Sequence, residues 1–136
     1  MTDRVYTIGY SGRKPAEILE IARELDATVF DVRFSPRSRV PHWTRGRLEQ
    51  LLGDRYRHVR ALGNRNYRGG PTDLVDFAAG LRLIQESDRP VVLMCACKDP
   101  AFCHRSTIAE KLRRAGMEVT ELNESRPVRY QQLELI

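Results

Sequence analysis

Apolar and polar residues alternate along the chain in two periods that predict strands separated by helices. Short apolar and β-branched runs predict strands at 5–8, 28–32, 56–59, 90–94 and 117–122. Between these runs, apolar residues recur every three or four positions and predict helices over 15–26, 44–52, 73–86 and 106–115. The ends of the helices carry typical signals, namely Pro15 in a first turn, Ser106 as an N-cap and Gly116 as a C-cap.

Strands that alternate with helices predict a parallel sheet covered on both faces. We therefore expect an α/β fold, a single Rossmann-like three-layer domain over 1–136 with a mostly parallel sheet of about five strands. Right-handed crossovers favour the strand order 3-2-1-4-5. Residues 123–136 form a C-terminal extension whose packing, like the oligomeric state, the sequence does not determine.

The apolar runs bear on localisation. None approaches the ~20 residues of a membrane helix, and the first five residues lack the apolar core of a signal peptide. We therefore expect a cytoplasmic protein without a membrane partner.

Positive charge is concentrated in one segment. The 136 residues include 23 basic and 18 acidic ones, a formal net charge of +5. Ten arginines and only two acidic residues lie within 33–68, so this segment carries +8 and the remainder −3. Guanidinium groups bind phosphates in a bidentate manner, which favours a phosphate-bearing small molecule or a nucleic acid as partner. A solvated face with local ion pairs is the alternative.

Basic and aromatic residues are interleaved inside this segment. Such a pattern is typical of surfaces that stack bases and hold phosphates. Trp43, the single tryptophan, fits equally well as an anchor of its loop to the core. The candidate nucleic-acid-binding residues are Arg37, Trp43, Arg45 and Arg47.

The loops after the first, second and fourth strands carry most of the reactive side chains. Ligands of open α/β sheets bind at the carboxyl ends of the strands, so we expect these loops to share one crevice. Its expected lining is Tyr10, Ser11, Asp31, Arg33, Arg39, Cys95, Cys103, His104 and Arg105.

The cysteine loop permits several chemistries. Cys95, Cys97, Cys103 and His104 supply the four S or N ligands that zinc requires, but their C-x-C-x5-C-H spacing lacks the usual knuckles, so no metal is favoured. Cys103 beside His104 and a helix N-terminus suits a thiolate nucleophile, although the Cys-x5-Arg spacing of tyrosine phosphatases is absent. An odd number of cysteines favours reduced thiols over disulfides.

Anion capture is a further chemistry open to the same crevice. Arg33, Arg105 and Ser11 are placed to hold a phosphate while His104 acts as acid or base near neutral pH. Asp31 would orient His104 or Arg105. An internal salt bridge between Asp31 and Arg33 is at least as well supported, because buried charges require partners.

Several motifs together resemble the domain of unknown function 488 family. They are Thr7-Ile-Gly-Tyr-Ser11, Asp31-Val-Arg33 with Pro36 and Ser38-Arg39, Leu62-Gly-Asn-Arg65, and Cys95-Ala96 with Cys103-His-Arg105. The resemblance spans nearly the whole chain and implies a compact α/β domain without an established activity. It also favours a ligand clamp formed by Tyr10 and Ser11.

The chain departs from the family pattern in three respects. Cys97 stands where the family usually has a glutamate, and the fifth strand ends Thr120-Glu121-Leu122 instead of in a histidine-containing pair. The stretch from Leu62 to Val91 is shorter than is common. A looser likeness to rhodanese domains rests on the Asp-Val-Arg motif and the cysteine loop, and is one of architecture only.

The leading hypothesis is an enzyme that binds a phosphate-bearing ligand, either a nucleotide or nucleic acid, in the crevice. Its catalytic residues would be His104, Cys103 and Asp31, and its ligand-binding residues Tyr10, Ser11, Arg33, Arg39 and Arg105. One alternative is a non-catalytic nucleic-acid-binding module that uses the 33–68 surface. Another is a rhodanese-like thiol or metal-dependent activity at the Cys95–Arg105 loop. The cofactor is not identified: the sequence itself requires none, and zinc is not favoured.

Overall fold

A computed structural model of the chain describes residues 4–100 and 103–123. The strands are β1 (Arg4–Gly9), β2 (Thr28–Asp31), β3 (Tyr56–His58), β4 (Val91–Cys95) and β5 (Glu118–Glu121). The helices are α1 (Pro15–Leu25), α2 (Arg45–Leu52), α3 (Phe77–Gln85) and α4 (Arg105–Arg114), with short 3₁₀ turns at Pro41–Trp43, Gly53–Arg55 and Arg60–Leu62. The predicted α/β fold with five parallel strands is confirmed, and the predicted extension lies, apart from Asn123, outside the described residues.

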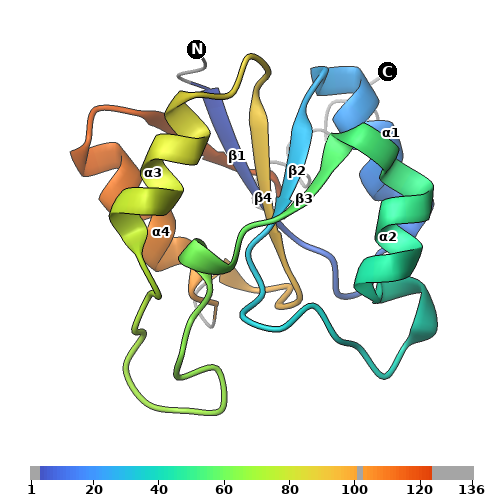
Figure 1. Cartoon of the computed structure of the whole chain (residues 1–136), viewed down its shortest axis with the longest axis horizontal. Coiled ribbons are helices and arrows are strands. Elements are labelled where there is room, and N and C mark those ends of the chain that lie inside the picture. Colours follow the sequence, from blue (N-terminus) through green and yellow to red (C-terminus); the bar gives the residue numbers. More distant parts are fainter. Residues whose placement is uncertain (1–3, 101–102, 124–136) are drawn as a thin grey trace, which may run out of the picture.

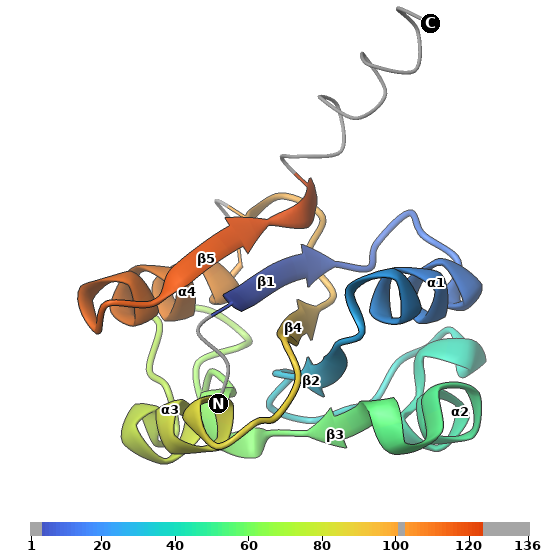
Figure 2. The same ribbon diagram turned by 90° about the horizontal axis from the view of Figure 1, so that it is seen from above.

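The sheet has the order β3-β2-β4-β1-β5, so the predicted order 3-2-1-4-5 is wrong in the placement of two strands (Figure 2). All five residues of β4 are buried, whereas β1 keeps Arg4 exposed and Tyr6 half-buried. The most apolar strand therefore occupies the centre, where both of its faces are covered. Right-handed crossovers satisfy either order and do not distinguish them.

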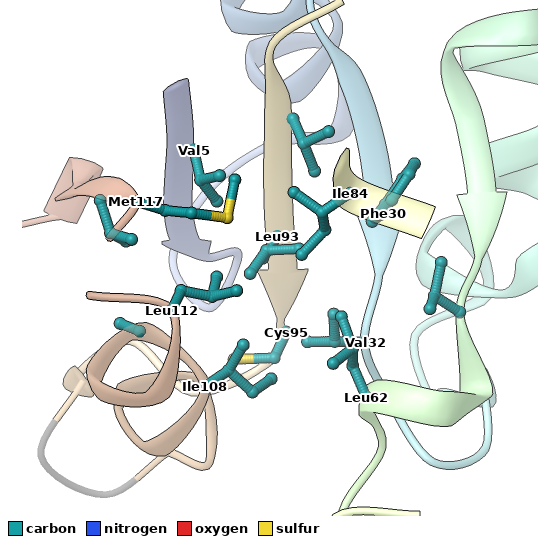
Figure 3. Close-up of a cluster of buried hydrophobic side chains, with 14 of the residues drawn as sticks. Val5, Phe30, Val32, Leu62, Ile84, Leu93, Cys95, Ile108, Leu112 and Met117 are labelled. Atoms are coloured by element: carbon teal, nitrogen blue, oxygen red, sulfur yellow. The ribbon is translucent and has the colours of Figure 1, made fainter. Parts of the chain in front are cut away.

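Two hydrophobic cores lie on opposite faces of the sheet. In Figure 1, α1 and α2 cover one face while α3 and α4 cover the other. Figure 3 shows the second core, in which Leu93 of β4 lies among side chains from both helices, including Ile84 and Leu112. Alternate residues of β4 thus serve alternate cores, with Val92 and Met94 packed toward α1 and α2.

Two helix starts differ from the sequence prediction. Helix α3 begins at Phe77 instead of residue 73, because residues 73–75 pair back onto 63–65 through an Asn64–Leu74 bridge. Asp76 then caps the helix by accepting a hydrogen bond from the Ala79 amide at 3.1 Å. In α4 the N-cap position belongs to His104, and Ser106 instead donates its hydroxyl to the Cys103 carbonyl at 2.9 Å.

The described helices are all too short or too polar to cross a lipid bilayer.

Candidate functional site

The loops after β1, β2 and β4 converge at the carboxyl edge of the sheet, as predicted. The Tyr10 amide donates to the Cys95 carbonyl at 2.9 Å, and on the other side of β4 the Val32 amide donates to the Met94 carbonyl at 3.0 Å. Gly9 fits against the β4 loop so closely that a Cβ atom there would overlap the Cys97 carbonyl oxygen. The cysteine loop is therefore flanked by the other two.

Asp31 and Arg33 form the internal salt bridge that the sequence offered as an alternative to ligand binding. Asp31 is fully buried and receives Nε and Nη2 of Arg33 at 2.9 and 2.6 Å, together with the Arg33 amide at 3.2 Å. The Tyr56 hydroxyl donates to the same carboxylate at 2.6 Å. Burial lowers the pKa of Arg33, but the hydrogen bond to Asp31 and the negative charge of Asp31 raise it by more, so the pKa of Arg33 is raised overall.

The opposite side of Arg33 holds an aromatic pair. Its Nη1 donates to the Trp43 carbonyl at 2.8 Å and to the Tyr10 hydroxyl at 3.2 Å. The Tyr10 and Trp43 rings stack with centroids 4.1 Å apart, and both residues are buried. Trp43 thus anchors its loop to the core and is not placed to stack bases, which corrects its assignment to the nucleic-acid interface.

A second buried ion pair joins α4 to β5. Arg105 is fully buried and donates through Nε and Nη2 to Glu121 at 2.8 and 3.2 Å. It also donates to Cys95 Sγ at 3.2 Å, to the Lys98 carbonyl at 2.9 Å and to the Cys97 carbonyl. A guanidinium has five N–H donors, so these five bonds occupy it and place Arg105 as a structural residue.

The cysteines do not form the three free thiols expected. Cys95 and Cys103 are joined as a disulfide, and Cys97 is free and exposed. Among residues 4–100 and 103–123, no three His, Cys, Asp or Glu side chains gather as metal ligands would.

His104 connects the cysteine loop to β2. Its Nε2 lies 2.8 Å from the Val32 carbonyl, and a carbonyl only accepts, so Nε2 carries the proton. Nδ1 is then unprotonated in the neutral ring, and it lies 4.0 Å from Cys103 Sγ. Burial, and secondarily the charge of Arg105, lowers the pKa of His104 against the raising effect of the Val32 bond. The imidazole is therefore neutral near neutral pH, with Nδ1 as its unprotonated nitrogen.

The remaining predicted residues lie on the outside. Ser11, Arg37, Arg39 and Arg47 are exposed. Arg45 is also exposed and pairs with Glu49 one helical turn away at 3.0 Å. Of the twelve predicted catalytic, ligand-binding and nucleic-acid-binding residues, seven are therefore tied into the body of the protein and five face solvent.

An exposed group of rings and arginines joins the loops after β2 and β3, and sequence reasoning did not single it out. Phe34 stacks on Tyr67 with centroids 5.5 Å apart and planes 21° apart. Arg60 lies 4.1 Å over the Phe34 ring, and Arg68 lies 5.5 Å over the Tyr67 ring. We call Phe34, Arg60, Tyr67 and Arg68 the aromatic–arginine stack. The Tyr67 side chain leaves 55% of its surface exposed.

Hydrogen bonds hold the loop that presents the stack. The Asn64 side-chain oxygen accepts from the amides of Asn66 and Asp73 at 3.0 and 2.9 Å, and the Val75 amide donates to the Gly63 carbonyl at 3.0 Å. A Cβ on Gly63 would lie 2.7 Å from Phe34 Cα, so the two loops are in close contact. Tyr67 and Arg68 consequently lie in a hydrogen-bonded loop between β3 and α3, and this loop extends from the carboxyl edge of the sheet (Figure 1).

A hollow of about 370 Å³ lies elsewhere, near the amino-terminal ends of β2 and β3. It contains none of the predicted site residues. Its lining is Thr28, Phe30, Asp54, Tyr56, Arg57, Leu83, Glu86 and Ser87.

Comparison with known proteins identifies one family. A model described as "Domain of unknown function DUF488" matches residues 65–112. This match supports the assignment of the chain to the DUF488 family. Within the matched region lie the tip of the stack, β4 and the Cys103-His104-Arg105 motif, so the DUF488 resemblance inferred from the motifs is confirmed there. The chain has no match among curated proteins or among solved structures.

Besides the stack, sequence reasoning missed Glu121, which pairs with Arg105, and Tyr56, whose hydroxyl donates to Asp31. A signal for Glu121 existed, because the exposed and buried positions alternate in β5 and place Glu121 on the same buried face as Val119. A carboxylate at an apolar position indicates a buried cationic partner. Tyr56, in a three-residue strand, carried no comparable signal.

Proposed function

We propose that this DUF488 member binds nucleic acid through the loops that follow β2 and β3. The observation that carries the proposal is the aromatic–arginine stack, which combines two guanidinium groups with two rings on an ordered, exposed loop pair. Guanidinium groups neutralise phosphates, and ring faces receive bases. A surface with both chemistries suits a polymer of nucleotides better than inorganic phosphate.

The charges around the stack support this proposal. Arg37 and Arg39 are exposed on the loop that carries Phe34, and Arg60 and Arg68 are exposed beside the two rings. Arg33, although it belongs to the same basic segment, is committed to Asp31. The +8 of residues 33–68 is thus only in part an internal structural charge, and the exposed part attracts polyanions.

The residues of the predicted crevice give weaker support to phosphate capture. Arg33 and Arg105 are two of the three arginines expected to bind the ligand, and both instead complete buried carboxylate pairs, whereas Arg39 is exposed. Every buried side-chain nitrogen and oxygen in the described part of the chain has a hydrogen-bond partner. We therefore place the anion-binding function on the exposed loops.

Fluorescence anisotropy with a labelled mixed-sequence oligonucleotide, measured from 25 to 300 mM salt, tests the proposal. Arg60→Gln with Arg68→Gln should weaken binding and lower the slope of log K against log salt by about 0.7 to 0.9 for each phosphate that the protein no longer neutralises. Arg23→Gln with Arg82→Gln is the matched control, because both residues are exposed on helices and the change in net charge is the same.

Two outcomes would overturn the proposal. One is the absence of binding by the unmodified protein at 25 mM salt. The other is an equal loss of affinity in the two double variants, which would mean that only net charge matters.

A second candidate function is thiol chemistry at the cysteine loop, and the 4.0 Å separation of His104 Nδ1 and Cys103 Sγ favours it. After a dithiol reductant has opened the Cys95–Cys103 bond, the neutral imidazole is placed to take the Cys103 proton and leave a thiolate. Iodoacetamide labelling of the reduced protein, located by mass spectrometry, measures this activation. Cys103 should be alkylated more slowly in His104→Gln while exposed Cys97 is unaffected; equal rates at Cys103 would exclude the function.

A further inference from the structure

The geometry of the aromatic–arginine stack points to a specific class of nucleic acid. We infer that the stack selects single-stranded nucleic acid over duplex, with an unpaired base stacking on Tyr67. This inference rests on the proposed function and adds the state of the strand to it.

The exposure of the rings is the first support for this selectivity. Tyr67 is the most exposed large hydrophobic residue of the described chain, at 55%. Phe34 beneath it is half-buried and stacked at 5.5 Å, so the Tyr67 ring has a supported side and a solvent side. An aromatic ring kept in water and held in place is available to a flat apolar partner.

The arrangement of the cations is the second support. Arg68 is exposed, and its guanidinium lies 5.5 Å from the centroid of the Tyr67 ring. A base that displaces this guanidinium from the ring gains stacking energy and frees Arg68 to pair with the adjoining phosphate. Arg60 is closer to its ring, at 4.1 Å from the Phe34 centroid, and provides a second positive charge near the base of the stack.

The shape of the loops is the third support. The faces of paired bases are covered by their neighbours in a duplex, and only base edges are accessible in its grooves. A ring platform on a loop tip receives base faces, which only an unpaired strand presents. Because a base face is common to all four bases, the stack should bind with little sequence preference.

The hydrogen bonding within the tip is the fourth support. The Asn66 side chain donates to the Pro71 carbonyl at 2.7 Å, and the Asn66 carbonyl accepts from the Gly69 amide at 2.9 Å. Gly69 and Gly70 have φ angles of 148° and 92°, values that favour glycine. The tip is thus closed by its own hydrogen bonds around Tyr67 and Arg68, and ordering it on binding costs little conformational entropy.

Three fluorescein-labelled probes separate stacking from charge. They are a twelve-nucleotide oligo-dT, the same strand paired with oligo-dA, and a twelve-unit abasic strand that keeps the phosphates and lacks bases. The unmodified protein should bind oligo-dT about 5- to 150-fold more tightly than the abasic strand, the range for stacking of one base, and more tightly than the duplex.

Variants at Tyr67 then assign the effect. Tyr67→Ala should lose most of the preference for oligo-dT over the abasic strand, and Tyr67→Phe should keep it. Because Tyr67 is exposed on a loop, both variants should stay folded, and Tyr67→Ala should lower the thermal midpoint only by the loss of its stacking on Phe34, which circular dichroism checks. Tyr6→Ala, at the half-buried Tyr6 of β1 remote from the stack, serves as a control and should keep the preference.

Failure of this inference is distinguishable from failure of the proposed function. Equal affinity for all three probes with a steep salt dependence would overturn single-strand selection and leave nucleic-acid binding intact. Tighter binding of the duplex would also overturn it. The absence of binding to every probe at 25 mM salt would overturn the proposed function as well.

Discussion

Replacing Arg105 by methionine distinguishes a structural arginine from a ligand-binding one. Arg105 is fully buried and makes five hydrogen bonds within the protein. Its removal takes two hydrogen bonds and the opposite charge away from the Glu121 carboxylate, 9% exposed, which keeps the Thr7 hydroxyl at 2.8 Å and the Asn123 amide at 3.1 Å among its donors. The backbone carbonyls of Cys97 and Lys98 are also deprived of a donor.

The magnitude follows from removing one partner of a buried ion pair, which costs about 3 to 5 kcal/mol. A chain of this size loses roughly 4 °C of thermal midpoint per kcal/mol, so Arg105→Met should lower the midpoint by about 12 to 20 °C. Replacing both partners removes the buried carboxylate together with the guanidinium. Arg105→Met with Glu121→Leu should therefore be destabilised by less than the sum of the two single changes, with a coupling of about 1 to 3 kcal/mol.

Urea unfolding followed by the fluorescence of Trp43 is a suitable assay, because this single tryptophan is buried against Tyr10. Arg47→Met is the matched control: Arg47 is exposed on α2, and the change should alter the free energy of unfolding by less than about 0.5 kcal/mol. An Arg105→Met protein as stable as the control, or one that loses oligonucleotide affinity while keeping full stability, would refute the structural assignment.

Three further predictions concern other parts of the same edge. The pKa of His104 is lowered on folding, so the unfolded chain binds more protons below about pH 6.5 and stability should fall as the pH drops from 7.5 to 5.5. His104→Gln, which keeps a donor for the Val32 carbonyl, should therefore show a flatter pH dependence of the urea midpoint. A slope that is unchanged in this variant would argue against burial of the neutral ring. Thiol titration in denaturant should find one free thiol, Cys97, without reductant and three after reduction; three thiols in the untreated protein would contradict the pairing. Gly9→Ala should prevent stable folding because its Cβ would overlap the β4 loop, whereas Gly46→Ala, with open space around it in α2, should raise stability by about 0.5 to 1 kcal/mol; calorimetry that finds the two variants alike would contradict the close approach.

The secondary structure followed from local patterns because each element satisfies its own periodicity. All nine predicted strands and helices exist, and the start of α3 moved by four residues because the side chain of Asn64 captures the Asp73 amide. The strand order did not follow from local patterns. The central position goes to the strand whose two faces are both apolar, because exposing either face to water would be unfavourable. All five residues of β4 are buried, whereas β1 has an exposed and a half-buried residue, so β4 takes the centre.

The convergence of the three loops could be predicted from the sequence, but the side-chain ion pairs that form there could not. Parallel strands align their carboxyl ends, so the meeting of Tyr10, Asp31 and Cys95 needs only the fold class. The partner that each buried arginine takes depends on side chains from distant strands, as with Arg105 and Glu121. Charge counting cannot separate such arginines from exposed ones.

The position of the exposed stack depended on loop geometry that the sequence does not determine. Phe34 and Tyr67 are 33 positions apart, and their contact requires Gly63 to fit against Phe34 and the 63–75 segment to fold back on itself. Trp43 is the residue type expected to stack on a base, yet its carbonyl accepts a hydrogen bond from Arg33 and its ring stacks on Tyr10. The ring that faces solvent belongs to Tyr67.

The most direct test of nucleic-acid binding at the loops after β2 and β3 is an NMR titration of the ¹⁵N-labelled protein with unlabelled oligo-dT. We expect the largest amide shift changes at Phe34, Arg60, Tyr67 and Arg68, and little change at Ser11, Cys97 and Glu121. Changes centred on Ser11 and Cys97 would place the ligand in the crevice, and the absence of any change would contradict binding altogether.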